Sequence, residues 1–350
     1  MARLANWIAP AVALAMLCGA AQAATLNANP SNIKAILLSA KGGDTIVMAP
    51  GEYPDQGLLR RTFEPALVID SHAAVMVGWQ FATVSGVTFR GGIFRVPPPM
   101  DSRKEPGTLA YGTAFQLYTA SHIHISDATF QGPGNLQVDP PVLGQGWGIR
   151  VNGGEDVWVT DSRFEGLRGG AAFGQIEGFK IVNNVSAGSR SDGFDVALSH
   201  RGLIEGNTCL GTQMSGEGEH PDCIQLWSRP TAPPVSDIVI RKNKIYGATQ
   251  GIGMFNHTRN GVNDGGFDRI VIEDNDIEVS FPHGIGINGE RDSIVRNNHV
   301  RTMKGAKYLT RISTEEATLR CGNTVADGGG KSGWTEKRCP PNSPPTPQQP

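Results

Sequence analysis

Five asparagines recur at one position of a short sequence pattern in the second half of the chain. The pattern is apolar–x–x–Asn–x–apolar, with Ser186 at the last place of the first copy. The asparagines are Asn184, Asn207, Asn243, Asn275 and Asn298, at intervals of 23, 36, 32 and 23 residues. A strand-forming repeat of this length predicts a solenoid in which each copy forms one coil. Because amides stacked on successive strands bond to one another, we expect the asparagines to be structural.

A second series of short strands precedes the asparagine pattern, and its alternation predicts which side chains face outward. The expected inward residues are Ile149, Ala172, Phe194, Ile224, Ile252 and Ile285. One expected outward column contains Arg150, Phe173, Asp195, Gln225, Gly253 and Gly286. The next outward column contains Asn152, Gln175, Ala197, Trp227, Phe255 and Asn288. The inward aliphatic positions explain the scaffold, so function is sought among the outward residues.

Composition limits the class of protein. The 350 residues include 45 glycines and 23 prolines, which favours many turns over long helices. The net charge is −2, and no run of Lys and Arg suggests nucleic acid as a partner. No apolar run after the N-terminal segment is long enough for a membrane span. We expect a monomer.

The chain divides into three predicted parts. Residues 1–23 have an apolar centre and an Ala21-Gln22-Ala23 cleavage pattern, which predicts a secretory signal peptide and a secreted or periplasmic protein. Residues 24–339 form the solenoid, which begins with a short capping helix around Ile33 and Leu37, with Ser31 as its N-cap. Residues 340–350 are rich in proline and are predicted to be disordered.

Four cysteines remain after the signal peptide, an even number that suggests two disulfides in an exported chain. Three pairings are possible, and buried free thiols are the alternative. We favour Cys209–Cys223 and Cys321–Cys339, because each pair closes a local loop.

Acidic residues gather on two successive coils. Asp192 and Asp195 belong to one coil, and His220 and Asp222 belong to the next. Parallel neighbours lie about 4.8 Å apart, so Asp192 and Asp222 should be stacked, with Asp195 beside Gln225. Carboxylates this close raise the pKa of one member, which suits the acid and base of a glycosidase or a Ca²⁺ site. The alternative is structural, because Asp before Gly is common in turns.

Two resemblances follow from these segments. Gly42–Tyr53 resembles the opening coil of secreted right-handed parallel β-helix proteins of the pectate-lyase type. Ser191–Asp195 with Asp222–Leu226 resembles the polygalacturonase-type glycoside hydrolases over about 100 residues. That resemblance implies that Asp192 and Asp222 activate the attacking water. Pro221 stands where the family has its general acid, so His220 or Asp195 would have to replace it.

Basic and aromatic residues flank the acids. The expected substrate-binding residues are Arg150, Arg168, Arg190, Gln225, Trp227, Phe255, His257 and His283. Arginine suits the planar carboxylates of uronic acids, although each arginine could equally serve solubility. Trp227 and Phe255 could face sugar rings, or they could be covered by the segment 256–267.

The fold class predicted is therefore all-β, a single-stranded right-handed parallel β-helix of the pectin-lyase type with an N-terminal capping helix. The expected function is cleavage of an acidic polysaccharide, with hydrolysis narrowly preferred and Asp192, Asp195, His220 and Asp222 as catalytic residues. A lyase or C5-epimerase is the close alternative, and a non-catalytic glycan-binding or envelope-structural protein is the third. A hydrolase would need no cofactor, whereas a lyase could use Ca²⁺ held by Asp192, Asp195 and Asp222.

Overall fold

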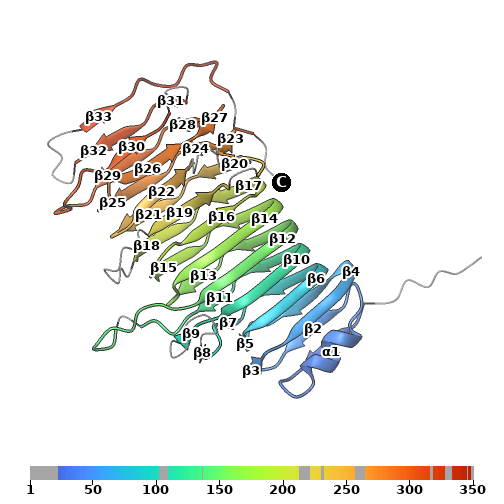
Figure 1. The fold of residues 1–350 in the computed structure, drawn as a ribbon. Coiled ribbons are helices and arrows are strands. Elements are labelled where there is room, and N and C mark those ends of the chain that lie inside the picture. The colour runs from blue at the N-terminus through green and yellow to red at the C-terminus, as the bar shows by residue number, and fades with distance from the viewer. Residues whose placement is uncertain are drawn as a thin grey trace, which may run out of the picture.

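The computed structural model describes residues 23–101, 109–135, 137–212, 221–229, 232–256, 265–315, 318–327, 333–344 and 346–347. Its strands run side by side in long parallel sheets and form an elongated stack of coils, with the single labelled helix at one end (Figure 1). Neighbouring strands come from successive coils, which is the arrangement of a parallel β-helix. The predicted fold class is confirmed.

The larger sheet forms two faces of the stack. Early coils pass through both faces in one long strand, whereas later coils use two strands separated by a corner; β14, for example, pairs with both β16 and β17. Among the described residues its strands are β1 (Thr25–Ala28), β2 (Thr45–Met48), β4 (Gly57–Asp70), β6 (Trp79–Arg90), β10 (Thr113–Ser126), β12 (Trp147–Thr160), β14 (Gly169–Val182), β16 (Phe194–Ala197), β17 (His200–Glu205), β19 (Asp222–Trp227), β20 (Val235–Arg241), β22 (Gln250–Phe255), β23 (Phe267–Asp268), β24 (Val271–Glu273), β26 (His283–Asn288), β27 (Glu290–Arg291), β28 (Ile294–Arg296), β30 (Arg311–Ser313) and β31 (Leu319–Cys321).

The smaller sheet closes the third face. Its described strands are β3 (Gly51–Pro54), β5 (Ala74–Val77), β7 (Ile93–Arg95), β11 (Thr129–Gln131), β13 (Arg163–Glu165), β15 (Val185–Ser189), β18 (Thr208–Thr212), β21 (Lys244–Gly247), β25 (Asp276–Val279), β29 (His299–Thr302), β32 (Thr324–Ala326) and β33 (Gly333–Thr335). The last pair, β32 and β33, is antiparallel and ends the sheet. A separate antiparallel pair joins β8 (Met100–Asp101) to β9 (Leu109–Ala110).

The helix α1 (Ile33–Ser39) covers the first coil with its buried residues Ile33 and Leu37, as predicted. Its N-cap is Asn32 instead of the predicted Ser31, and no side chain caps the helix. The reason is local: Asn29 Oδ1 accepts hydrogen bonds from the Ser31 hydroxyl and from the backbone N–H groups of Ser31 and Asn32. The Ser31 hydroxyl is therefore engaged in the turn before the helix.

The interior changes its packing along the stack. In the early coils, Phe94, Phe130 and Phe164 stack with ring centroids 5.1 and 4.6 Å apart. In the later coils, isoleucines such as Ile240 and Ile272 occupy the core and are fully buried. Burying such side chains stabilises the coils, each by about 1.5–3 kcal/mol.

The repeated asparagines form the predicted ladder. Each side chain is buried, and its Nδ2 donates to the Oδ1 of the next asparagine, as Asn207 does to Asn243 at 3.0 Å. The same Nδ2 donates to a backbone carbonyl of the preceding coil, which is that of Ile181 for Asn207. The ladder extends beyond the five predicted members. It continues to Asn323, whose Nδ2 donates to Glu336 Oε2 at 2.6 Å, and Ser162 precedes it.

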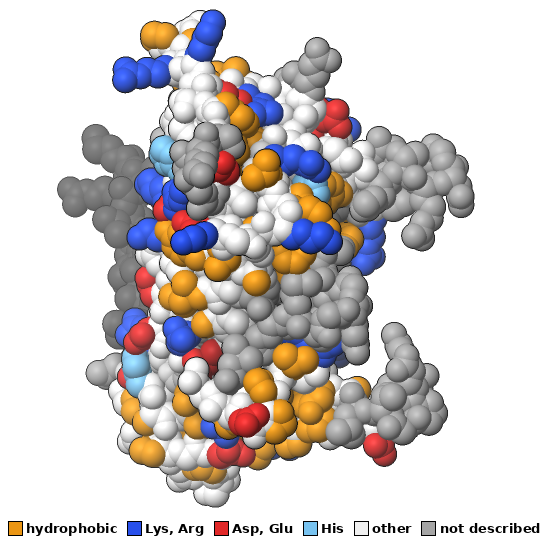
Figure 2. Space-filling view, turned by 90° about the vertical axis from the view of Figure 1, so that its left-hand side faces the viewer, with side chains coloured by type: hydrophobic (Ala, Val, Ile, Leu, Met, Phe, Trp, Pro, Cys, Tyr) orange, Lys and Arg blue, Asp and Glu red, His pale blue; other side chains and the backbone are white. Residues whose placement is uncertain are grey.

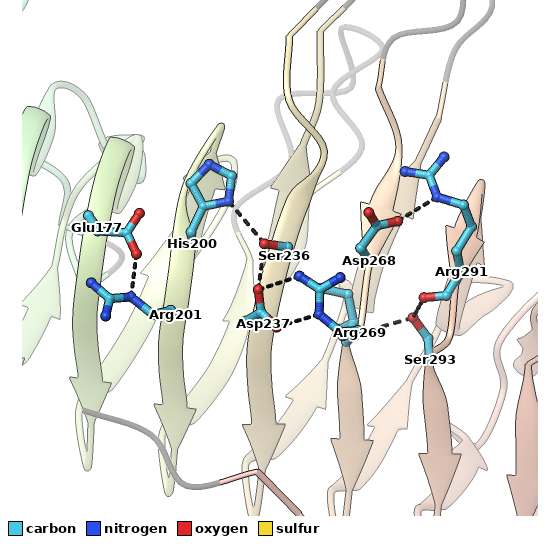
Figure 3. Close-up of polar contacts among 10 residues, drawn as sticks. Glu177, His200, Arg201, Ser236, Asp237, Asp268, Arg269, Arg291 and Ser293 are labelled. Atoms are coloured by element: carbon cyan, nitrogen blue, oxygen red, sulfur yellow. Dashed lines mark hydrogen bonds and ion pairs between the residues drawn. The ribbon is translucent and has the colours of Figure 1, made fainter.

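Charged residues occupy one corner of the later coils, inside strands β17 and β20 and between β23 and β24. Arg201, Asp237 and Arg269 have left-handed backbone torsions, with φ of 53°, 59° and 54°. Figure 3 shows their side chains linked along the stack: Arg201 pairs with Glu177, and Arg269 forms a two-bonded pair with Asp237 at 2.6 Å. Solvent-exposed pairs of this kind contribute little individually, about 0–1 kcal/mol each. The ion pairs at the corners therefore add little to the stability of the fold. The buried core and the asparagine ladder contribute most of it.

The predicted signal peptide lies almost wholly outside the described residues, which begin at Ala23. The segment predicted to be disordered contains residues that contact the stack: Arg296 donates to the Pro344 carbonyl and to the Thr346 hydroxyl, both at 2.7 Å. Among the described residues, no helix has the length and apolar character needed to cross a membrane.

Candidate functional site

Two outward columns run along the stack on β10, β12, β14, β16 and β19. One column contains Gln116, Arg150, Ala172, Asp195 and Gln225. The column beside it contains Tyr118, Asn152, Gly174, Ala197 and Trp227. The residues between Arg150 and Asp195, and those between Asn152 and Trp227, are small. The surface is therefore open between the large side chains.

These columns form a groove with a volume of about 660 Å³. Its described lining includes the aromatic residues Tyr118, Trp147 and Trp227, together with the buried Phe173, and one carboxyl, that of Asp195. Tyr118 and Trp227 are 40% and 42% exposed, so large apolar surfaces face the groove. Arg150 lies against the Trp147 ring, with its guanidinium carbon 5.2 Å from the ring centroid. A groove with aromatic faces and a few polar groups is suited to a ligand with both apolar and hydroxylated surfaces.

Asp195 is the acid that opens onto this groove. Its Oδ1 is buried and has no hydrogen-bond partner within the described part of the chain. Burial raises its pKa well above the ordinary value, and the charges of Asp192 and Asp222 raise the pKa further. Arg150 and a hydrogen bond from Trp227 act in the opposite direction and only partly offset this rise. A carboxyl in this state can carry a proton that it donates to a bound ligand.

Asp192 and Asp222 lie close to each other and influence Asp195, but neither belongs to the described lining of the groove. The backbone N–H of Asp222 donates to Asp192 Oδ1 at 2.9 Å, and both residues are buried. The carboxyl of Asp222 lies over Gly253, where a Cβ would be only 2.6 Å from Asp222 Oδ1. A side chain at position 253 would thus displace the acid. The predicted stacking of Asp192 with Asp222 and the pairing of Asp195 with Gln225 are confirmed.

Both predicted disulfides are present. Cys209–Cys223 joins β18 to β19, with the Cα atoms 5.9 Å apart, and its second cysteine follows Asp222 directly. Cys321–Cys339 lies at the C-terminal end of the stack, with the Cα atoms 4.9 Å apart. The first disulfide therefore fixes the strand that carries Asp222.

One part of the predicted register is wrong. Ala171 pairs with Ile149 and Phe194, so Ala171 and Phe173 face inward and Ala172 faces outward. Phe173 is only 1% exposed, and Gly174 occupies the outward place expected for Gln175. The cause is the burial of the aromatic ring: a shift of one residue exchanges the two faces, and only this register places Phe173 in the core.

The structure separates the predicted substrate-binding residues into groups. Arg150 and Trp227 line the groove, whereas Arg168 and Arg190 are not part of its described lining. Gln225 is buried beside Asp195. Further along the stack, Phe255 and His283 contact each other edge to face at 5.2 Å, next to Gly286. His220 and His257 lie outside the described residues.

The groove also contains residues that the sequence did not lead us to expect. Tyr118 and Gln116 come from β10, where no asparagine marks the coil, and Trp147 is the first residue of β12. Extending the strand alternation from Arg150 back by one coil would have indicated both β10 residues. In the described ranges, no group of three or more His, Cys, Asp or Glu side chains is placed to hold a metal ion.

Comparison with known proteins defines the class. The family described as "right handed beta helix region" matches residues 82–264, about half of the chain, and the protein belongs to this family. A search of curated proteins gives no match.

Several solved structures share the fold. The Dettilon tailspike protein has 13% identity and a TM-score of 0.51, covering 87% of this chain; the chain spans 59% of the tailspike's own length. PfbA, a surface adhesin of Streptococcus pneumoniae, has 12% identity and a TM-score of 0.50, covering 85% of this chain and 83% of the adhesin. A family 28 exopolygalacturonase of Yersinia enterocolitica has 12% identity and a TM-score of 0.47, with coverages of 89% and 67%. At these identities the likeness concerns the fold, which does not determine function.

Proposed function

We propose that the protein is an extracytoplasmic enzyme that hydrolyses glycosidic bonds in an acidic, uronate-containing polysaccharide bound along the groove. The observation that carries the proposal is the position of Asp195, a carboxyl with a raised pKa that borders a groove lined with aromatic residues. The two disulfides support a location in an oxidising compartment.

We assign roles to the groove residues from their positions, and to Asp192 and Asp222 from the polygalacturonase resemblance. Asp195 donates its proton to the glycosidic oxygen as the bond from that oxygen to the anomeric carbon breaks. A water molecule attacks the anomeric carbon and gives a proton to the carboxylate of Asp192 or Asp222, the residues indicated by the polygalacturonase resemblance. Arg150 binds a uronate carboxylate, and Trp227 and Tyr118 contact the faces of sugar rings.

Hydrolysis agrees with the groups present better than elimination does. A lyase needs a base beside the C5 proton, whereas burial and two neighbouring acids raise the pKa of Asp195. Such a group donates a proton more readily than it removes one. The raised pKa of Asp195, which borders the groove, therefore supports hydrolysis, because hydrolysis needs an acid beside the glycosidic oxygen.

The test is incubation with uronate polymers, followed by measurement of reducing ends and of the ultraviolet absorbance of unsaturated sugars. We expect new reducing ends without that absorbance. Asp195→Asn should lower kcat by about 10²–10⁴-fold while the fold is retained. Asp156→Asn is the matched control, because Asp156 lies on β12 and outside the groove lining. The activity of the Asp156→Asn variant should equal that of the wild type.

Other results would contradict the proposal in distinct ways. Unsaturated products would indicate a lyase, and binding without any product would indicate a glycan-binding protein. Full activity of Asp195→Asn would show that another group supplies the proton.

A further inference from the structure

A second hydrophobic cluster lies on the outside of the stack, away from the groove. Leu203, Val239, Val271 and Ile294 face outward on successive strands, yet Val239 is 0% and Val271 is 3% exposed. Two residues after each of these apolar positions stands a charged residue, and the sign of the charge alternates from one strand to the next. We call the two rows together the outer stripe: the apolar row Leu203, Val239, Val271 and Ile294, and the charged row Glu205, Arg241, Glu273 and Arg296.

The charged row contains an ion pair that is largely removed from solvent. Arg296 and Glu273 have side chains 12% and 7% exposed and approach to 2.7 Å. Charges buried in this way need further hydrogen bonds to offset their lost hydration. Those bonds come from the proline-rich segment. Thr346 Oγ1 donates to Glu273 Oε1 at 2.6 Å and accepts from Arg296 Nη2 at 2.7 Å, while Arg296 Nη1 donates to the Pro344 carbonyl.

The route of the chain explains how this segment reaches the stripe. Cys321 occupies the next place of the charged row after Arg296, and its disulfide to Cys339 starts the segment directly above that row. A turn follows, in which the Ser343 N–H donates to the Pro340 carbonyl at 3.0 Å. The chain then passes from Arg296 toward Glu273, back along the stack. The hydrogen bonds of Pro344 and Thr346 therefore follow closely after the Cys321–Cys339 disulfide, which holds the start of the segment in place.

The chemistry of the segment matches the stripe. Proline has no N–H that needs an acceptor, and the carbonyl of Pro344 receives its hydrogen bond from Arg296 of the charged row. Proline also restricts the free chain, which reduces the entropy lost on docking. We propose that the outer stripe is a docking site for an extended, proline-rich segment bearing a hydroxyl side chain. Its occupant is the chain's own proline-rich segment, through the described residues 340–344 and 346–347, which acts as a strap on the last coils.

The strap can be tested in the full-length chain. Thr346→Val removes the two hydroxyl bonds to charged groups and should weaken docking at least tenfold. Ser343→Ala is the matched control, because the Ser343 hydroxyl donates to Pro340 within the segment itself. A labelled peptide of residues 340–350 is added at up to millimolar concentration, which is comparable to the effective concentration of a tethered segment. Fluorescence anisotropy should detect binding to Thr346→Val and to a chain lacking residues 340–350, but neither to the wild type nor to Ser343→Ala.

Different results would contradict different parts of the proposal. Equal uptake of the peptide by the wild type and Thr346→Val, or equal binding of a scrambled peptide, would overturn the proposal. A wild-type dimer joined by exchanged segments would overturn occupancy by the chain's own strap. If the shortened chain does not fold, the comparison of Thr346→Val with Ser343→Ala still decides. Because the stripe lies outside the groove, failure here would leave the proposed hydrolysis untouched.

Discussion

At the scale of single residues, Asp195 links stability to the proposed chemistry. Its pKa is raised in the folded chain by burial and by Asp192 and Asp222. The folded state therefore holds this proton at pH values at which the unfolded chain has lost it. The contribution to stability is complete below the ordinary aspartate pKa and is lost as the pH rises through the raised folded value. The acid that suits catalysis thus costs stability near neutral pH.

Asp195→Asn should consequently increase the free energy of unfolding at neutral pH, with little change near pH 3.8, the ordinary value for Asp. The substitution keeps the size of the side chain and removes the buried charge. Denaturant unfolding across this pH range measures the effect. Asp156→Asn should behave oppositely, because hydrogen bonds to His122 and His124 outweigh partial burial and lower the pKa of Asp156. An Asp195→Asn chain that is less stable than the wild type at neutral pH would contradict the assignment.

The sequence indicated Asp195 and Trp227 because each departs from what the coil repeat requires. It misplaced Phe173, since Gly169, Gly170, Ala171 and Ala172 give no alternation from which a register can be read. Only the preference of one aromatic ring for the core decides that coil. Tyr118 was not predicted, because its coil has no asparagine by which its strand could be aligned with those of the later coils.

At the scale of elements, the asparagine ladder joins coils of unequal length. Asn243 Oδ1 accepts from both the backbone N–H and the Nδ2 of Asn207, and Asn243 Nδ2 donates to Asn275 Oδ1 and to the Ile204 carbonyl. The residue before each rung lies at a corner with positive φ, as at Lys242 and Asp274. The five repeated copies made this ladder predictable. Its ends were not: Arg320 stands at the first apolar place of the Asn323 copy, and Ser162 replaces the asparagine between Val159 and Phe164.

Removal of one rung should be costly. Asn243→Ala leaves buried donors of Asn207 without an acceptor, so we expect the free energy of unfolding to fall by about 2–4 kcal/mol. Lys244→Ala, at the adjacent exposed position, should change it by less than about 0.5 kcal/mol. Urea unfolding of both variants checks the difference. Equal stabilities would mean that water or a shifted neighbour replaces the amide.

At the scale of the whole molecule, the two ends of the stack are closed by different devices. Helix α1 covers the first coil, and β33 pairs antiparallel with β32 at the last, with Trp334 opposite Val325. Glu336 then accepts a hydrogen bond from Asn323 and pairs with Arg320. A sheet edge left open can recruit another chain, so the antiparallel strand protects against association.

Trp334→Pro should weaken this protection, because proline lacks the N–H needed for strand pairing. We expect association that increases with protein concentration, whereas Thr335→Ala should behave like the wild type. Light scattering coupled to size-exclusion chromatography measures the mass. A Trp334→Pro chain that stays monomeric at every concentration would show that β33 does not protect the edge.

The ladder also has a consequence for how such a chain can grow during evolution. Each rung accepts from the rung before it and donates to the rung after it, so every rung presents the same two interfaces. If a coil were duplicated and inserted between two others, its asparagine could form the same hydrogen bonds with both neighbours. No buried amide would then lack a partner. The number of coils can therefore change during evolution with little effect on stability. The three aspartates come from two neighbouring coils, so those two coils must be kept together.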